Sequence, residues 1–490
     1  MDIVLGGNGK QKVSLDSSMT NRHGVITGAT GTGKTVTLQV LAESFSRLGV
    51  PVFTADVKGD LSGIAGAGKA HPKITERLDY IGIDDHQFGE SPVRFWDIWG
   101  KSGHPIRATI SSFGPTLLAS LLQLNDTQAG ILHIAFSIAD DEGLLLLDLK
   151  DLRSMLNWVA DNAKDIARDY GRVSRQSVDA ILRKLLVLDE AGGDQFFGEP
   201  ALDIQDLLAR NDAGQGIINL LDATQLLQSP RIYTTFLLWL LSELMENLPE
   251  RGDAELPELV FFFDEAHLLF DTAPPALLET ISQVTRLIRS KGVGIFFVSQ
   301  YPNDIPDDVL GQLGCRIQHA LRAFTPKDKK AVKVAAKSFR ENPDFDTAEV
   351  ISNLGVGEAL ISTLDKKGIP TVVQKTLMSP PASQFGPITK TRRKAIHNDS
   401  PLSAVYDQMI DRESAFEILR EKELAAIARA EEELAMEEAT GNKTTTRRKK
   451  SSGRRRQSTV EKLVKSVART VGSSLGRQIL RGILGSISRR

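Results

Sequence analysis

The segment Gly28-Ala29-Thr30-Gly31-Thr32-Gly33-Lys34-Thr35 follows a short apolar run, Gly24-Val25-Ile26-Thr27, and leads into a helical pattern. The spacing G-x-x-x-x-G-K-[ST] lets a strand turn tightly into a helix while backbone N–H groups point at one spot, where the helix N-terminus adds its positive end. Such a concavity suits a polyphosphate: Lys34 reaches the β- and γ-phosphates, and the Thr35 hydroxyl is placed to ligate Mg²⁺. All eight residues are therefore predicted to bind ATP, with Mg²⁺ as the cofactor. The alternative is a glycine-rich turn that binds nothing.

Two acids end a second apolar run. Residues 259–263 are entirely apolar, as expected of a buried parallel strand, and Asp264 and Glu265 follow them directly. Asp264 is predicted to hold Mg²⁺, and Glu265 to polarise the attacking water. An apolar strand that ends in Asp-Glu is common by itself, and the phosphate loop is what makes a catalytic assignment the better interpretation.

A polar amide ends a third apolar run. Residues 294–299 are predicted to form another buried strand, and Gln300 follows them. Its side chain could hydrogen-bond both the lytic water and the γ-phosphate. The alternative is a polar residue that merely starts a loop.

The order of apolar and periodic segments predicts an α/β fold with a mostly parallel central sheet. The strand at 216–222 puts a strand between the phosphate loop and the Asp-Glu strand, as expected for NTPases with an extra central strand. Strands are predicted at 24–27, 51–56, 216–222, 259–263, 294–300 and 316–321, a closing hairpin at 357–362 and 370–374, and helices at 34–48, 230–246, 307–313 and 326–339. The predicted domains are the first part of the ATPase core (1–104), an inserted helical subdomain (105–210), the rest of the core (211–378), a linker (379–401), a charged helix (402–439), a disordered basic linker (440–460) and a basic amphipathic helix (461–490).

Composition narrows the class of protein. A single cysteine, Cys315, excludes a disulfide framework, and the absence of Cys/His clusters at ligand spacing argues against structural zinc. The N-terminus lacks the features of a secretory signal, and no apolar run is long enough to span a bilayer. A cytoplasmic protein is expected.

Charge is unevenly distributed. From Lys443 to Arg490 there are fifteen Lys and Arg against one acid, so this tail carries +14 and the rest of the chain about −16. Residues 461–490 place apolar residues four apart between basic ones, which suggests a helix that binds an anionic membrane, nucleic acid or a partner. A solvated tail that only aids solubility is the alternative.

Together these motifs resemble the HerA/FtsK branch of P-loop NTPases, in particular HerA-like ATPases that begin almost directly at the nucleotide loop. The matching segments are 22–35, 56–60, 264–267, 289–294 and 299–302. The resemblance implies a RecA-like ATPase that assembles as a ring, often a hexamer. An arginine from the neighbouring subunit completes each ATP site. Arg289 is the first candidate for that finger, with Arg286 and Arg316 in reserve.

The same resemblance implies movement along duplex DNA, in some members with a nuclease partner. Only some 20 residues precede the loop, so the N-terminal β-barrel of known HerA translocases is not expected here. Three functions remain open: an ATPase that translocates on or remodels DNA, a polypeptide-handling or secretion-type ATPase held at the inner membrane face by its tail, and an NTP-binding scaffold with little turnover.

Overall fold

The computed structural model describes all of residues 1–490 except 227–229, 253, 273–274 and 442–490. The predictions for 440–460 and 461–490 therefore fall almost entirely outside the described residues. Contacts divide the chain into two units, Met1–Arg412 and Glu413–Arg490, and each is considered by itself.

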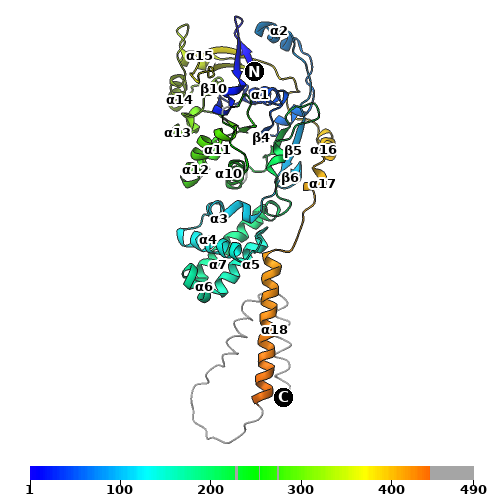
Figure 1. Ribbon diagram of the computed structural model, residues 1–490. Coiled ribbons are helices and arrows are strands. Elements are labelled where there is room, and N and C mark those ends of the chain that lie inside the picture. The colour runs from blue at the N-terminus through cyan, green and yellow to red at the C-terminus, as the bar shows by residue number, and fades with distance from the viewer. Residues whose placement is uncertain (227–229, 253, 273–274, 442–490) are drawn as a thin grey trace. The chain divides into compact units, whose positions relative to one another are not determined.

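Twelve strands within the described residues form one sheet in the first unit (Figure 1). In spatial order they are β2 (Lys12–Asp16), β1 (Asp2–Gly7), β12 (Gln374–Met378), β11 (Glu358–Ser362), β10 (Cys315–Gln318), β3 (Gly24–Thr27), β9 (Val293–Ser299), β8 (Leu259–Phe263), β4 (Val52–Asp56), β7 (Ile218–Asp222), β5 (Val93–Asp97) and β6 (His104–Pro105).

The eight strands from β10 to β6 pair in parallel, whereas β2, β1, β12 and β11 pair antiparallel. Parallel strands need helical crossovers, which cover both faces of a sheet and bury each strand on both sides. The run Leu259–Phe263 is accordingly buried at every position. The predicted α/β fold with a mostly parallel sheet is thus confirmed.

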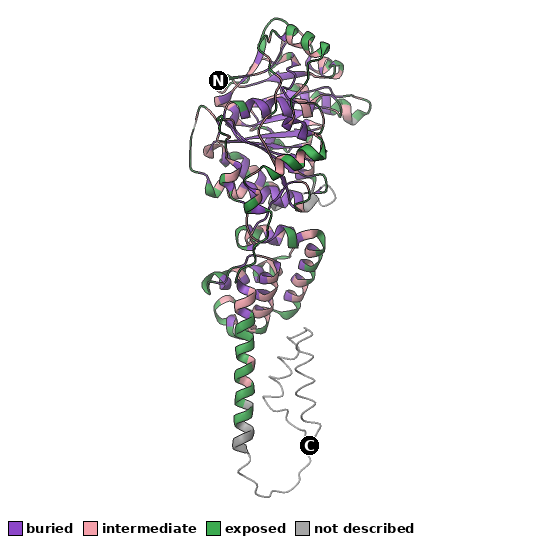
Figure 2. Ribbon diagram, turned by 90° about the vertical axis from the view of Figure 1, so that its right-hand side faces the viewer, coloured by how far each residue is buried: buried purple, intermediate pink, exposed green. Residues whose placement is uncertain are grey.

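Aromatic side chains join the central strands on both faces. Phe262 of β8 stacks on Phe296 of β9, with ring centroids 5.2 Å apart, and Phe263 stacks on Phe297 at the same distance. Because side chains alternate between the faces of a strand, the two pairs lie on opposite sides of the sheet. They hold β8 beside β9 from both layers, and Figure 2 shows the sheet as the most continuously buried part of the molecule.

The extra central strand is β9, not the strand at 216–222. β9 lies between β3 and β8, whereas β7 pairs with β4 and β5 farther out. The order of strands along the chain did not reveal this position, because β9 follows β8 in sequence and returns to the centre of the sheet. Sequence patterns also missed β1, β2, β5 and β6, which are short or lie near the ends of the sheet.

Helices pack around the sheet and over its edges (Figure 1). Those flanking it are α1 (Lys34–Arg47), α2 (Pro72–Ile81), α10 (Pro230–Asn247), α11 (His267–Thr272), α12 (Pro275–Leu287), α13 (Asp307–Leu310), α14 (Pro326–Lys337), α15 (Thr347–Asn353), α16 (Lys390–Asn398) and α17 (Ser403–Tyr406). The second unit contains α18 (Ala415–Gly441), whose described side chains are mostly exposed. Within the described part of the chain, every helix is too short or too polar to cross a lipid bilayer.

Between β6 and β7 the chain is largely helical. The helices are α3 (Ile110–Leu121), α4 (Asp126–Asp141), α5 (Leu149–Asp161), α6 (Ala163–Tyr170), α7 (Arg175–Leu188), α8 (Asp194–Phe196) and α9 (Ile204–Leu207). Asp148 caps α5 by accepting from the backbone N–H of Lys150 and Asp151, and the buried Asp151 accepts in return from Asp148. Such reciprocal caps satisfy N–H groups that a helix leaves unpaired at its start.

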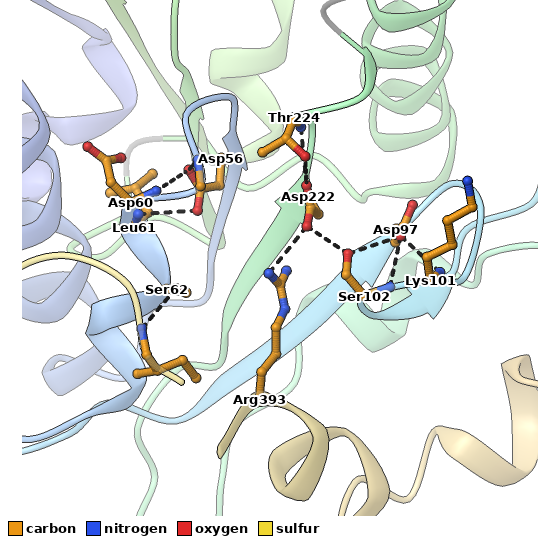
Figure 3. Close-up of polar contacts among 12 residues, drawn as sticks. Asp56, Asp60, Leu61, Ser62, Asp97, Lys101, Ser102, Asp222, Thr224 and Arg393 are labelled. Carbon is orange, nitrogen blue, oxygen red and sulfur yellow. Dashed lines mark hydrogen bonds and ion pairs between the residues drawn. The ribbon is translucent and has the colours of Figure 1, made fainter. Parts of the chain in front are cut away.

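The range predicted as a linker, 379–401, differs from that description, because it packs on the core. The buried carboxylate of Glu43 accepts from the backbone N–H groups of Ala382 and Ser383, at 2.8 and 3.1 Å. Farther along, Arg393 of α16 pairs with Asp222 at the end of β7, and Ser102 bridges Asp222 to Asp97 (Figure 3). The range predicted as one charged helix, 402–439, contains α17, a non-helical stretch and most of α18.

Candidate nucleotide-binding site

The phosphate loop joins β3 to α1. Gly28, Gly31 and Gly33 have φ of 153°, 77° and 119°, which side chains other than glycine rarely adopt. A Cβ atom on Gly28 would also lie only 2.5 Å from Cβ of His319. Lys34 is the first residue of α1, and its Nζ donates to the carbonyl oxygens of Gly28 and Ala29, at 2.6 and 3.2 Å. The ammonium group therefore lies over the concave face that the loop presents.

Neighbouring strands brace this loop. Its Ala29 N–H donates to the carbonyl of Ala320 at 2.8 Å, and its Thr32 carbonyl accepts from Gly357 N–H at 2.9 Å. His319 joins α1 to β11, because Nε2 lies 2.9 Å from Thr37 Oγ1 and Nδ1 lies 2.9 Å from the Glu358 carbonyl. Burial lowers the pKa of His319 to about 4, so the ring is neutral at pH 7. It can then donate from Nδ1 and accept at Nε2.

Asp264 and Glu265 follow β8 and thus lie at the same edge of the sheet as the loop. Asp264 is almost completely buried, and burial together with the Glu265 charge raises its pKa to about 7, although Lys58 opposes the shift. Glu265 has a φ of 48°, an uncommon value for a side chain that is not glycine. Such backbone strain is typical of functional sites, where the surroundings hold a residue in place.

Lys58 connects the two acids to the turn after β4. Its Nζ lies 2.5 Å from Glu265 Oε1. Burial lowers the pKa of Lys58, but the hydrogen bond and ion pair with Glu265 outweigh burial and raise it. The turn itself is held by Asp56, whose carboxylate accepts from the N–H groups of Gly59, Asp60 and Leu61 (Figure 3).

Sequence reasoning singled out the segment 56–60 but gave Lys58 no role, and it missed His319. Both were within reach of the same argument, because each follows the end of a buried parallel strand. Burial, followed by Lys58, lowers the pKa of Lys34, and the charges of Glu265 and Asp264 oppose that decrease. The loop lysine and the acidic pair therefore interact electrostatically.

Gln300 lies opposite the first residue of the loop. β3 and β9 run in register from Gly24↔Phe296 to Thr27↔Ser299, and Gly28 N–H donates to the Gln300 carbonyl at 3.2 Å. The residue thus lies at the same edge as Lys34 and the acids.

Thr35 and Asp264 fit the predicted cation. A hydroxyl and a carboxylate offer the oxygen ligands that Mg²⁺ prefers. Asp264 Oδ1 accepts from the backbone N–H of Glu265 at 3.0 Å, which leaves further lone pairs on the carboxylate. The donor set is therefore compatible with Mg²⁺ bound between the loop and β8.

The three candidate arginines lie at the opposite edge of the sheet. Arg289 precedes β9, Arg286 is near the end of α12 and Arg316 is on β10, and together with Arg22 they line one cavity of about 450 Å³. None of the described residues that line this arginine cavity is acidic. Since β9 rises about 3.3 Å per residue, its two ends lie roughly 20 Å apart. The arginines are thus far from the loop of their own chain.

Comparisons with known proteins place the chain among named relatives. The chain is 23% identical over 369 residues to the protein named DNA double-strand break repair helicase HerA from Saccharolobus solfataricus, and 23% identical over 388 residues to the protein of the same name from Sulfolobus acidocaldarius. These alignments cover 73% and 76% of this chain, and 64% and 68% of the relatives. The chain thus spans less than two thirds of the first relative's length.

Among solved structures, the bacterial conjugative coupling protein TrwBdeltaN70 superposes with a TM-score of 0.51 at 14% identity, covering 82% of this chain and 91% of the other. That likeness concerns the fold alone. The family model described as "Helicase HerA-like C-terminal" matches residues 3–490. The chain therefore belongs to the HerA-like helicase C-terminal family, in the HerA/FtsK branch of P-loop ATPases.

Proposed function

We propose that this protein is a Mg²⁺-dependent ATPase of HerA/FtsK type that assembles as a ring, with a hexamer favoured, and translocates on or remodels DNA. The observation that most supports hydrolysis is the meeting of Lys34, Asp264 and the Lys58–Glu265 pair at one edge of the sheet. The relatives named as DNA repair helicases support DNA as the partner.

In the proposed reaction, the loop N–H groups and Lys34 hold the triphosphate, and Thr35 and Asp264 hold the cation. Bound Mg²⁺ would neutralise charge on the β- and γ-phosphate oxygens. Glu265 orients the attacking water and accepts its proton, with Gln300 as a second contact to that water. Lys58 fixes the Glu265 carboxylate through Oε1, which leaves Oε2 to accept from the water.

An arginine from the neighbouring subunit completes the site. Positive charge is needed beside the γ-phosphate as negative charge spreads over it. Within one chain the candidate arginines lie at the edge opposite the loop, so a head-to-tail ring offers a direct way to bring the two edges together. Arg289 remains the first candidate, because it lies just before β9, the strand that Gln300 follows.

The test is ATP turnover by the full chain with duplex DNA, single strands, anionic liposomes or no addition. Duplex DNA is expected to raise the rate, and Lys34→Ala to abolish turnover under all four conditions. Lys164→Ala, which changes an exposed lysine on α6, is the matched control and should behave as wild type.

The other outcomes separate the alternatives. Stimulation by liposomes alone would favour the membrane-associated ATPase. A slow rate that Glu265→Gln leaves unchanged would favour the scaffold. If no polymer or membrane raises the rate, the DNA part of the proposal is lost, while hydrolysis itself can still be judged from Lys34→Ala.

A further inference from the structure

Three potential metal ligands meet at the β6 end of the sheet, far from the phosphate loop in strand order. His104 is on β6, His397 is in the last turn of α16, and Asp407 directly follows α17. One ligand atom from each lies within 4.8 Å of the others. Asp407 Oδ1 is 2.9 Å from His104 Nδ1, and its Oδ2 is 2.9 Å from His397 Nε2.

The cluster suits a divalent cation. Imidazole nitrogens and a carboxylate oxygen are common ligands of divalent cations. The two imidazole rings stack with centroids 4.2 Å apart, so both present their edges to the same carboxylate. His397 faces Asp407 through Nε2, and its other ring nitrogen, Nδ1, is buried without a hydrogen-bond partner.

A cavity of about 390 Å³ gives access to the cluster. Its lining includes His397, Asp407, Gln195 and Arg107. The guanidinium of Arg107 is held by a hydrogen bond of 2.8 Å to the Tyr406 carbonyl. Its positive charge opposes a bare cation but favours a water or anion as the fourth ligand. The cavity thus has room for the open coordination position of a three-ligand site.

We propose that His104, His397 and Asp407 bind one Zn²⁺, which fastens the segment 390–407 to the β6 end of the sheet. Imidazole nitrogens with a carboxylate oxygen suit zinc, whereas Mg²⁺ prefers oxygen ligands throughout. Six strand spacings of about 4.8 Å put β6 roughly 29 Å from β3, so this site is separate from the nucleotide cation.

The spacing rule applied to the sequence could not find such a site, because it recognises ligands that are close along the chain. His104 and Asp407 are 303 residues apart, and only the packing of α16 and α17 against β5 and β6 brings them together. The expectation that the chain lacks structural zinc rested on that rule.

The experiment uses the full chain without any histidine tag, stripped with a chelator and then titrated with Zn²⁺ alone. Metal content and calorimetry should give one tight site per chain, and Zn²⁺ should raise the melting temperature. His397→Ala and Asp407→Asn should each weaken binding by at least 10-fold, in line with loss of one ligand. His133→Ala removes an exposed histidine of α4 and should bind as wild type.

Co²⁺ substitution gives a second readout, because a four-coordinate site with nitrogen and oxygen ligands produces a visible absorption band. That band should vanish in Asp407→Asn while circular dichroism shows an intact fold. The proposal is overturned if the untagged wild type binds no stoichiometric Zn²⁺, or if His397→Ala binds as tightly as wild type. A melting temperature that depends on pH but not on Zn²⁺ would assign the cluster to hydrogen bonding and would equally reject the metal.

Discussion

The two edges of the parallel sheet present different charged groups. At the carboxyl edge lie Asp264, Glu265 and the turn held by Asp56, beside a lysine that is itself paired with an acid. At the amino edge, four arginines line a cavity whose described lining holds no acid. In the proposed reaction each edge carries only half of the groups that phosphoryl transfer requires, so a second copy of the chain would supply the other half.

Mixing two inactive variants tests most strongly whether the two edges meet between subunits. Arg289→Ala alone should lower ATP turnover by about 10³-fold, and Glu265→Gln alone by about 10²-fold or more, with ATP binding retained in both. In mixed rings, an interface with the loop of the first variant and the arginine of the second is intact, so turnover should recover. Steady-state phosphate release at varied mixing ratios is the measurement.

Arg289→Lys is the matched control, because it keeps the charge but loses the planar fork, and it should remain strongly impaired. If the mixture shows no recovery although both variants form rings of normal size, the two edges do not meet across an interface. Recovery with Arg286→Ala or Arg316→Ala but not with Arg289→Ala would move the finger to one of those residues.

A smaller effect, on the pH dependence of stability, is expected at the carboxyl edge alone. The folded-state pKa of Asp264, about 7, lies above the ordinary value of 3.8. Between these values the folded state binds more protons than the unfolded state, so stability falls as pH rises through this window. Asp264→Asn removes this decrease. Without Mg²⁺, the free energy of unfolding of the variant should rise relative to that of wild type from pH 5 to 8. The difference should reach at least about 1 kcal/mol, or roughly 2 °C in melting temperature.

Thermal melting across this pH range in chelator is the measurement. Some slope should persist in the variant below about pH 6, because burial and Asp60 also raise the pKa of Asp56 to about 6. Asp212→Asn, at an exposed turn, should leave the whole profile unchanged. Parallel profiles of melting temperature against pH for wild type and Asp264→Asn would show that the folded state does not raise the pKa of this carboxyl group.

The smallest expected effect concerns the amino edge alone. An acid-free cavity with four arginines should bind a polyanion weakly, so tripolyphosphate should raise the melting temperature even of Lys34→Ala, whose loop is disabled. At a tripolyphosphate concentration near the dissociation constant, the free energy of unfolding increases by about 0.4 kcal/mol. Adding Arg286→Ala should reduce it, whereas Arg172→Ala, in an exposed loop, should not. An equal gain in all three proteins would place the anion elsewhere.

Local patterns predicted the centre of the sheet because each central strand has a recognisable local sequence. The strands at 24–27 and 259–263 are observed with these bounds, and the helix at 230–246 differs by one residue. Parallel strands buried on both faces are continuous apolar runs, and the loop glycines have a fixed spacing. Apolar runs and motif spacing therefore sufficed for the part of the molecule that holds the loop and the Asp-Glu pair.

Other features depend on residues far apart in the chain. β1 pairs with β12, where Gly6 lies opposite Met378, and no local pattern encodes that pairing. The ion pair of Lys58 with Glu265 and the shared cavity of the arginines likewise arise only when the strands are ordered. The position of β9 was missed for the same reason: strand order is a property of the assembled sheet.

The packing of Glu43 decides where the protein can be shortened. Its carboxylate is 99% covered, and backbone N–H groups of Ala382 and Ser383 are among its donors. Truncation after residue 378, at the end of β12, would remove both of these donors and the chain that packs on the carboxylate. A trimmed version for crystallisation should therefore end no earlier than Arg412, the last residue of the first unit.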